Sequence, residues 1–211
     1  VGLTSQNIFK NKFLIMIKEV NKYITERGIV GYEGNVGQLI EQQSKIKEIL
    51  DQSNPKKILE IGFNAGHSSE LFLSNTSATV LSFEIKNNDC VKAIHNHLNK
   101  LYDNRHSIIY GDSKETIPQY IYENPDDRFD LIFIDGGHEL ITSQTDLLNC
   151  MSLSHESTVV IMDDYCPGNV DASWCFGPTW AWKEAISNKM VNELGNKVFL
   201  KQITKFNPFK E

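Results

Sequence analysis

The chain lacks an excess of positive charge. Its 211 residues include 21 lysines and arginines against 27 aspartates and glutamates, so the formal net charge at pH 7 is -6. General binders of nucleic acid need clustered cations to neutralise the phosphate backbone. The composition therefore disfavours nucleic acid as a partner.

Long apolar runs are absent as well. No stretch approaches the roughly 18 consecutive apolar residues of a membrane span. The N-terminus shows no charged segment followed by a compact apolar segment and a cleavage site. We therefore expect a soluble, cytoplasmic protein with no membrane partner.

Cysteines are few and are not arranged as a framework. The four are Cys90, Cys150, Cys166 and Cys175, and no two of them form a CxxC pair. Disulfide scaffolds and zinc sites both need closer or repeated pairs. We expect reduced thiols and no zinc site.

The length suits one domain, because a single core remains efficient below roughly 250 residues. We divide residues 1–211 into N-terminal helices (1–54), a central core (55–165) and a loop, helix and terminal hairpin (166–211). The first part contains an apolar helical stripe over residues 8–26, which Gly28 ends. A second helix is expected over about 37–50.

From residue 56 onward, strand-like and helix-like segments alternate. The strand-like runs are "KKILEIG", "TVLSFEI", "HSIIYGD", "FDLIFID" and "STVVIMD". Such alternation predicts an α/β fold of the Rossmann-like, doubly wound type: a mostly parallel seven-stranded sheet with helices on both faces. Residues 178–189 are expected to be helical. The tail is expected to form a C-terminal antiparallel hairpin about Gly195 and Asn196, the alternative being a helix followed by a strand.

Acidic residues and glycines gather where these strands end. In an open parallel sheet the carboxyl ends of the strands share one crevice, in which ligands bind. A single acid at a strand end is explained equally well as a solvated turn former, but five successive strands share the feature. The residues are Glu60, Gly62, Glu84, Asp112, Asp135, Asp163 and Asp164.

The first of these loops, "LEIGFNAGHSS", lies between a strand and a helix that begins near His67 and Ser68. Gly62 and Gly66 allow the backbone to approach a ligand, and a helix N-terminus favours an anion. The spacing is not the Gly-x-Gly-x-x-Gly of dinucleotide-binding sites, which weighs against NAD. Glu84 ends the next strand, where a carboxylate can accept hydrogen bonds from ribose hydroxyls.

In order and spacing, the motifs "ILEIGFNAGHSS", "LSFEI", "YGDS", "FDLIFIDGGH" and "VVIMDD" resemble those of class I S-adenosylmethionine-dependent methyltransferases. They are most similar to the catechol O-methyltransferase type and to metal-dependent sugar O-methyltransferases. The segment "EGNVGQLI" resembles the one that closes over the cofactor in that group.

The resemblance implies that S-adenosyl-L-methionine is the cofactor, and it assigns a role to each matching residue. Carried over position by position, it places the methionine end at Glu60, Gly62, Gly66 and Ser68, the ribose at Glu84, and the adenine at Asp112 and Ser113. Asp135 borders the same pocket.

The resemblance also implies a divalent cation. Asp135, Asp163 and Asp164 match the positions that hold one in the metal-dependent members. Three carboxylates suit Mg²⁺ first, with Mn²⁺ or Ca²⁺ as alternatives. Catechol-type enzymes commonly have asparagine at the third position and sugar enzymes can have aspartate, which favours the sugar enzymes. The other interpretation is that Asp163 and Asp164 only bind water or cap backbone groups.

His138 stands where the catechol type has a lysine that acts as general base. A hydroxyl is a poor nucleophile until its proton leaves, and imidazole titrates near neutral pH. A bound cation would also lower the pKa of the hydroxyl. His138 and Asp135 are therefore the candidate catalytic residues, although the cation alone is an alternative to a histidine base.

The loop 165–180 follows the candidate metal acids. Its aromatic residues Tyr165, Trp174, Phe176 and Trp180 are candidates for an acceptor pocket, whereas Trp182 is expected in the core. A hydrophobic rim here has a second interpretation, a homodimer contact. Elsewhere, His95 and His97 are expected at the surface, because residues two apart on a helix face different directions.

These features together predict a metal-assisted O-methyltransferase that acts on a small hydroxylated acceptor such as a sugar or phenolic diol. Two alternatives remain. One is an oxidoreductase with a nucleotide cofactor, and the other is a methyltransferase-like fold that binds a cofactor or partner without turnover.

Overall fold

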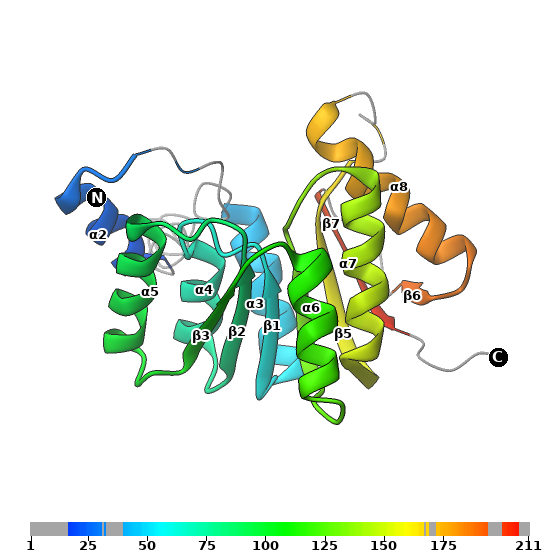
Figure 1. The fold of residues 1–211 in the computed structure, drawn as a ribbon, viewed down its shortest axis with the longest axis horizontal. Helices are drawn as coiled ribbons and strands as arrows, with labels where there is room; N and C mark the ends of the chain where they lie inside the picture. The colour runs from blue at the N-terminus through cyan, green and yellow to red at the C-terminus, as the bar shows by residue number, and fades with distance from the viewer. Residues whose placement is uncertain are drawn as a thin grey trace, which may run out of the picture.

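The computed structural model describes residues 17–30, 32, 40–166, 168, 172–193 and 200–206. It forms one sheet of seven strands in the order β3-β2-β1-β4-β5-β7-β6 (Figure 1). The strands are β1 (Lys57–Ile61), β2 (Thr79–Glu84), β3 (His106–Tyr110), β4 (Phe129–Ile134), β5 (Ser154–Tyr165), β6 (Val191–Glu193) and β7 (Leu200–Phe206).

Strands β1 to β5 are parallel, β7 runs antiparallel to β5, and β6 runs antiparallel to β7. The predicted Rossmann-like α/β class is confirmed, and the parallel part of the sheet is these five strands. Residues 194–199 lie outside the described part of the chain. They include Gly195 and Asn196, about which the sequence predicted a hairpin turn.

The helices are α2 (Glu19–Arg27), α3 (Ile40–Ser53), α4 (His67–Asn75), α5 (Asp89–Leu101), α6 (Ser113–Glu123), α7 (Leu140–Ser152) and α8 (Ser173–Ser187). Helix α2 ends at Gly28 in the left-handed conformation, as the sequence predicts. Residues 8–16 of the expected first helix, and most of the segment expected to close over the cofactor, lie outside the described residues.

Successive residues of the central strands enter different apolar clusters. Ile58 and Phe133 pack with the cluster that covers α2 to α5, whereas Leu59 and Ile132 pack with the cluster under α6 to α8. Side chains of a strand alternate between its two faces, and both faces are covered by helices, as Figure 1 shows. This arrangement explains why the β4 sequence is apolar without interruption.

Helix α2 is fastened to α4 by a buried carboxylate. Glu70 is 1% exposed and accepts backbone N–H bonds from Lys18, Glu19 and Val20 at 2.9, 2.9 and 2.8 Å. The first turn of α2 has no side-chain cap of its own from Lys18, so Glu70 satisfies N–H groups that a helix start leaves unpaired. The start of α2 is thereby fixed beside the helix that follows the first glycine loop.

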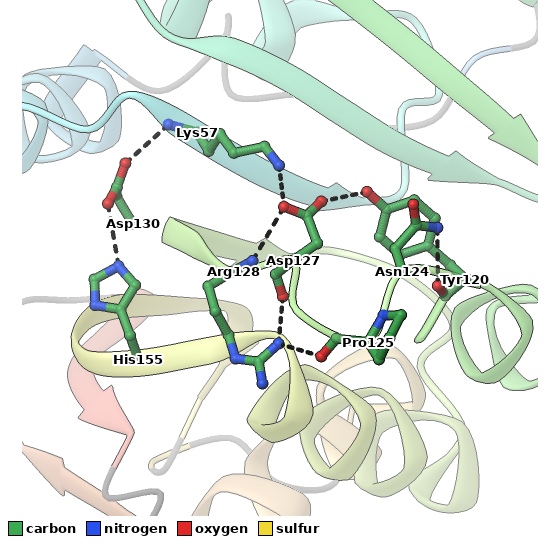
Figure 2. Close-up of polar contacts among 8 residues, drawn as sticks. All are labelled: Lys57, Tyr120, Asn124, Pro125, Asp127, Arg128, Asp130 and His155. Atoms are coloured by element: carbon green, nitrogen blue, oxygen red, sulfur yellow. Dashed lines mark hydrogen bonds and ion pairs between the residues drawn. The ribbon is translucent and has the colours of Figure 1, made fainter. Parts of the chain in front are cut away.

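The amino ends of β1, β4 and β5 are joined by a polar network (Figure 2). Asp130 Oδ2 accepts the backbone N–H groups of Lys56 and Lys57 at 2.7 and 2.9 Å, and its Oδ1 contacts His155 Nε2 at 3.1 Å. Asp127 accepts from the Lys57 ammonium and the Tyr120 hydroxyl. The polar side chains at the amino ends of these strands are therefore hydrogen-bonded or ion-paired with one another. The residues that the sequence singles out lie at the carboxyl ends of the strands.

The four cysteines form no disulfide within the described residues, and Cys150 and Cys175 are buried. Within the described residues, no helix is long and apolar enough to cross a membrane.

Candidate active site at the carboxyl edge of the sheet

The carboxyl ends of β1, β2 and β4 are tied to one another directly after the strands end. Gly62 N–H donates to Phe83 O at 2.9 Å, and Asp135 N–H donates to Ile61 O at 2.8 Å. The strand order reverses between β1 and β4, and such a switch point is where open α/β sheets bind ligands. The sequence prediction that these strand ends meet is confirmed.

Gly62 permits the closest of these approaches. A Cβ atom at this position would lie 2.0 Å from the Asp135 carbonyl oxygen, and the φ angle of Gly62 is +93°. No other residue type adopts that conformation without strain or fits that space. Gly62 thus brings the first loop into contact with the residue that follows β4.

Glu60 is completely buried beneath this loop. One carboxylate oxygen, Oε2, accepts hydrogen bonds from the hydroxyls of Ser69 and Ser82, each at 2.5 Å. Among the described residues, no hydrogen bond of normal geometry reaches the other oxygen, Oε1, which is buried. Burial raises the pKa of Glu60, and the hydroxyls of Ser68, Ser69 and Ser82 act in the opposite direction. A buried acceptor without a donor is costly, so a donor from a ligand would be favoured here.

Helix α4 begins at His67, after Gly66 in the left-handed conformation, and its N-terminus has no side-chain cap. Ser68 lies in this first turn and is 7% exposed. Unpaired N–H groups and the helix dipole favour an anion at such a position. His67 itself is buried, which lowers its pKa to about 4, and its Nε2 contacts Asn21 Oδ1 at 3.0 Å.

Glu84 closes the second strand with both of its oxygens engaged. Oε2 accepts from Asn64 N–H and Oε1 accepts from Lys86 N–H, each at 2.6 Å. Asn64 belongs to the first glycine loop, so the carboxylate fixes that loop and the turn after β2 together. Glu84 is 4% exposed.

Asp112 is the N-cap of α6. Its Oδ1 accepts from Lys114 N–H at 3.0 Å, and its Oδ2 lies 3.0 Å from Lys114 Nζ. The Lys114 side chain, and then its backbone N–H, lower the pKa of Asp112. Ser113 begins the helix and contributes a hydrogen bond that acts on the pKa of Asp146.

Asp135 and His138, which follow β4, and Asp164, which lies in β5, form a cluster of potential metal ligands. Each of the three offers an atom within 4.8 Å of the others, and no other such group is found among the described residues. His138 Nε2 lies 2.9 Å from Asp164 Oδ2. Asp164 has a φ angle of 60°, which is uncommon for a residue other than glycine. Backbone strain of this kind is concentrated at functional sites.

Asp163 does not belong to that group of three. Its Oδ1 accepts from Gln42 Nε2 of α3 at 3.3 Å and from Asp164 N–H at 2.9 Å. Of the three acids predicted to bind a cation, the structure therefore brings Asp135 and Asp164 together with His138, and it places Asp163 against α3.

Helix α8 starts earlier than the sequence predicts. A helix was expected over residues 178–189, but residues 173–177 also lie within α8. Gly177 permits close packing here, because a Cβ there would lie 2.1 Å from the His138 carbonyl oxygen. The first turns of α8 therefore pack directly on the turn that carries His138, which fixes its position.

The candidate aromatic residues divide into two kinds. Trp174, Phe176 and Trp180 are 44%, 45% and 46% exposed, and the rings of Phe176 and Trp180 lie 6.2 Å apart. Tyr165 is partly buried against the cluster under α6 to α8. Trp182 is fully buried, as predicted.

The prediction that His95 and His97 are surface residues is wrong. Both are half-buried: His97 stacks on Tyr23 with ring centroids 4.1 Å apart, and His95 Nδ1 contacts His106 Nδ1 at 2.7 Å. Helix α2 and strand β3 cover them, and neither contact has a signal in the local sequence. His106, which has no evident partner in the sequence, is 2% exposed and lies within this network.

Sequence reasoning also missed Asp146, a fully buried residue of α7. A Cβ at Gly136 would lie 3.0 Å from its Oδ2, so Asp146 lies beneath the turn after β4. Burial is the main cause that raises its pKa to about 6, and Ser113 and Lys114 partly offset it.

A family model described as a methyltransferase domain matches residues 59–165. An O-methyltransferase from Bacillus cereus, solved in complex with SAH, has a TM-score of 0.71 and 16% identity, covering 96% of this chain and 97% of that chain. TomG from Streptomyces achromogenes, an O-methyltransferase of tomaymycin synthesis in complex with SAM, has a TM-score of 0.72 and 14% identity, covering 96% of both chains.

CalS11, a TDP-rhamnose 3'-O-methyltransferase of calicheamicin biosynthesis, has a TM-score of 0.62 and 15% identity, covering 98% of this chain and 97% of that chain. At these identities the solved structures share the fold of this chain.

Proposed function

The chain belongs to the methyltransferase-domain family as a class I S-adenosylmethionine-dependent methyltransferase, and we propose that it methylates a hydroxyl oxygen of a small acceptor with the help of a divalent cation. One observation carries the proposal: Asp135, His138 and Asp164 gather within 4.8 Å at the strand ends beside the glycine loop. Methyl transfer needs an oxygen held and deprotonated at this place.

The cofactor would lie over the ends of β1, β2 and β3. Glu60 and Ser68 would hold its methionine end, Glu84 its ribose, and Asp112 and Ser113 its adenine, with Gly62, Gly66 and Asp135 shaping the pocket. Two features support this placement: the buried Oε1 of Glu60, which no hydrogen bond of normal geometry reaches from the described residues, and the uncapped start of α4. The first suits a cationic amino group, and the second suits a carboxylate.

A divalent cation would be held by Asp135 and Asp164, which lie in the group of three with His138, and Asp163, the residue before Asp164, would supply a third carboxylate. Carboxylate oxygens are the preferred ligands of Mg²⁺, with Mn²⁺ and Ca²⁺ as alternatives. Asp163 and Asp164 follow Met162, which is paired with the last residue of β4, so the acids of both strands lie at one edge. When bound, the cation would orient the acceptor and lower the pKa of its hydroxyl.

His138 would accept the proton of that hydroxyl. Its Nε2 faces Asp164 Oδ2, so a neutral imidazole that donates from Nε2 keeps Nδ1 as the basic atom. A carboxylate that orients a histidine in this way fixes the tautomer and stabilises the imidazolium that forms. Gly177 lets α8 pack on the turn that carries His138, and this packing would keep the imidazole aligned with the acceptor hydroxyl.

The acceptor would lie between this cluster and the exposed face of α8. Trp174, Phe176 and Trp180, with Tyr165 at the end of β5, offer aromatic surface against which a sugar ring or a phenol can pack. The similarity to CalS11, a TDP-rhamnose 3'-O-methyltransferase, supports the sugar class. The same aromatic face is also the place where a homodimer contact would form.

The proposal is tested by calorimetry and by turnover. We expect S-adenosylhomocysteine to bind tightly and NAD not to bind. The Glu84→Gln variant should bind S-adenosylhomocysteine more weakly than the wild type. Tight NAD binding without S-adenosylhomocysteine binding would instead support the oxidoreductase. Consumption of S-adenosylmethionine across a panel of sugar and phenolic diols, with and without EDTA, separates an enzyme from a fold that binds without turnover.

A further inference from the structure

A chain of buried hydrogen bonds runs from α5 through β3 and β2 to Glu60. His95 Nδ1 contacts His106 Nδ1 at 2.7 Å, and His106 Nε2 contacts Ser82 Oγ at 2.8 Å. The Ser82 hydroxyl then donates to Glu60 Oε2 at 2.5 Å. His106, Ser82 and Glu60 are at most 2% exposed, so water does not compete for these bonds.

Asn99 sets the direction of this chain. The backbone N–H of His106 donates to Asn99 Oδ1 at 3.0 Å, which identifies that atom as the oxygen. The amide nitrogen of Asn99 is therefore the donor to His95 Nε2, at 3.3 Å. Because Nε2 accepts, a neutral His95 carries its proton on Nδ1 and donates to His106 Nδ1.

The same logic continues to the carboxylate. His106 accepts at Nδ1, so its proton is on Nε2 and is donated to Ser82. The Ser82 oxygen is then used as an acceptor, and its proton is directed at Glu60. His106 Nε2 also lies 3.3 Å from Ser69 Oγ, a longer contact than the one to Ser82, and the series ends on Glu60 as a pure acceptor.

This assignment requires both histidines to be neutral, and their burial favours the neutral form. Burial, followed by repulsion from His95, lowers the pKa of His106 to about 3, and burial lowers the pKa of His95. His106 also stacks on Phe63, with ring centroids 4.9 Å apart and an interplanar angle of 26°. Phe63 belongs to the first glycine loop, so the chain lies directly below the cofactor loop.

We propose that His106 is a positioning residue for cofactor binding: with His95 and Asn99 it holds the Ser82 hydroxyl as a donor to Glu60 Oε2. The Ser82 donor favours the ionised form of Glu60 and occupies Oε2, which leaves Oε1 for the cationic methionine end of the cofactor. The inference rests on the proposed function, because it assumes that Glu60 meets that group. The roles of Asn99, His95, His106 and Ser82 are additional to it.

The nearly isosteric change Asn99→Asp should reverse the donor and acceptor roles along the whole series of hydrogen bonds. A carboxylate accepts from His106 N–H as before, but it cannot donate to His95 Nε2. His95 would then carry its proton on Nε2, His106 would carry its proton on Nδ1, and Ser82 would donate to His106 Nε2. Glu60 would lose the Ser82 donor and keep Ser69.

The tautomers are read by long-range ¹H–¹⁵N spectra of the imidazoles. We expect a proton on Nδ1 of His95 and on Nε2 of His106 in the wild-type chain, and the opposite pair in Asn99→Asp. There are six histidines in the chain, so single His→Gln variants assign the signals. A change that merely loosened packing would not exchange the two tautomers.

Calorimetry with S-adenosylhomocysteine gives the functional consequence. We expect Asn99→Asp to weaken its affinity about tenfold or more, the loss typical of one hydrogen bond to a charged group. Asn96→Asp is the control, since Asn96 is exposed on the same helix and the charge change is identical. It should bind like the wild type.

Failure of the inference differs from failure of the proposed function. A wild-type chain with the opposite tautomers, or an Asn99→Asp chain that exchanges them and binds with unchanged affinity, overturns the role of His106. A wild-type chain that has the expected tautomers and binds no S-adenosylhomocysteine overturns the proposed function instead. If Asn99→Asp does not fold, the wild-type spectra and the affinity of Ser82→Ala, which should also fall, decide the point.

Discussion

The Nε2 atom of His138 lies 2.9 Å from the Oδ2 atom of Asp164, across the edge where β4 and β5 end. His138 lies in the turn after β4 and Asp164 lies in β5, and two backbone features hold them in place. Asp164 has a left-handed conformation, and Gly177 allows α8 to pack on the His138 turn. A carboxylate beside an imidazole at a strand edge is an arrangement suited to proton transfer.

His138→Gln tests this role. We expect methyl transfer to fall by roughly 10² to 10⁴-fold, the usual contribution of a positioned general base, while S-adenosylhomocysteine binding stays unchanged. His155→Gln is a matched control, because His155 also faces an aspartate, Asp130, and is similarly exposed, but at the opposite edge of the sheet (Figure 2). Equal activities of the two variants would contradict the assignment of His138.

Gly62→Ala tests the close approach of β1 and β4. The added Cβ would meet the Asp135 carbonyl oxygen, so we expect the strand ends to separate, with loss of S-adenosylhomocysteine binding in calorimetry. Gly28→Ala is the comparison, since Gly28 also has a positive φ but has nothing within 4 Å of the added atom. Its cost should be the conformational strain alone, roughly 1 to 2 kcal/mol. A Gly62→Ala chain as stable as Gly28→Ala in urea unfolding would refute this account.

Asp146→Asn should stabilise the protein at alkaline pH. Burial raises the pKa of Asp146 to about 6, above its ordinary value of 3.8. The favourable contribution of the protonated group is therefore complete below pH of about 4 and is lost as the pH rises through 6. A pKa difference of about two corresponds to about 3 kcal/mol of stability. The free energy of unfolding of the variant should therefore exceed that of the wild type by about this amount at pH 8 and by less at pH 5.

Urea unfolding at both pH values checks this expectation. Glu156→Gln, at an exposed position of β5, removes the same charge and should leave the difference between the two pH values as in the wild type. An Asp146→Asn chain that is destabilised equally at pH 5 and pH 8 would argue that the carboxylate is paired and ionised.

The sequence was sufficient for the layout of the parallel sheet. Runs such as Leu131 to Ile134 are apolar without interruption because both faces of β4 are covered. The acids that end the strands follow from the same logic, since parallel strands bring their carboxyl ends to one edge. The resemblance to class I methyltransferases, carried by these motifs, is confirmed by the family match.

Contacts between distant segments were not predictable in the same way. Glu70 meets the start of α2 across about fifty residues, and His95 meets His106 only because α5 packs on β3. Asp146 looks like an ordinary polar residue of a helix, yet it is buried. In each case the determining partner is supplied by tertiary packing, and local sequence carries no trace of it.

The start of α8 was missed for a related reason. The segment 165–180 is rich in glycine and aromatic residues and includes Pro178, a composition typical of a loop. In the structure Gly177 serves close packing on the His138 turn, and Pro178 is accommodated within the helix. The exposed aromatic residues of α8 therefore project from a fixed helical surface.

The central claim is that the ends of β4 and β5 hold a divalent cation where the acceptor hydroxyl is methylated. Mn²⁺ titration followed by electron paramagnetic resonance, in the presence of S-adenosylhomocysteine, tests it most directly. We predict one bound Mn²⁺ per chain, displaced by excess Mg²⁺, lost in Asp135→Asn and retained in Asp126→Asn, an exposed position before the amino end of β4, whereas the site lies after its carboxyl end. A wild-type chain that leaves all Mn²⁺ free, or an Asp135→Asn chain that binds it like the wild type, would contradict the account.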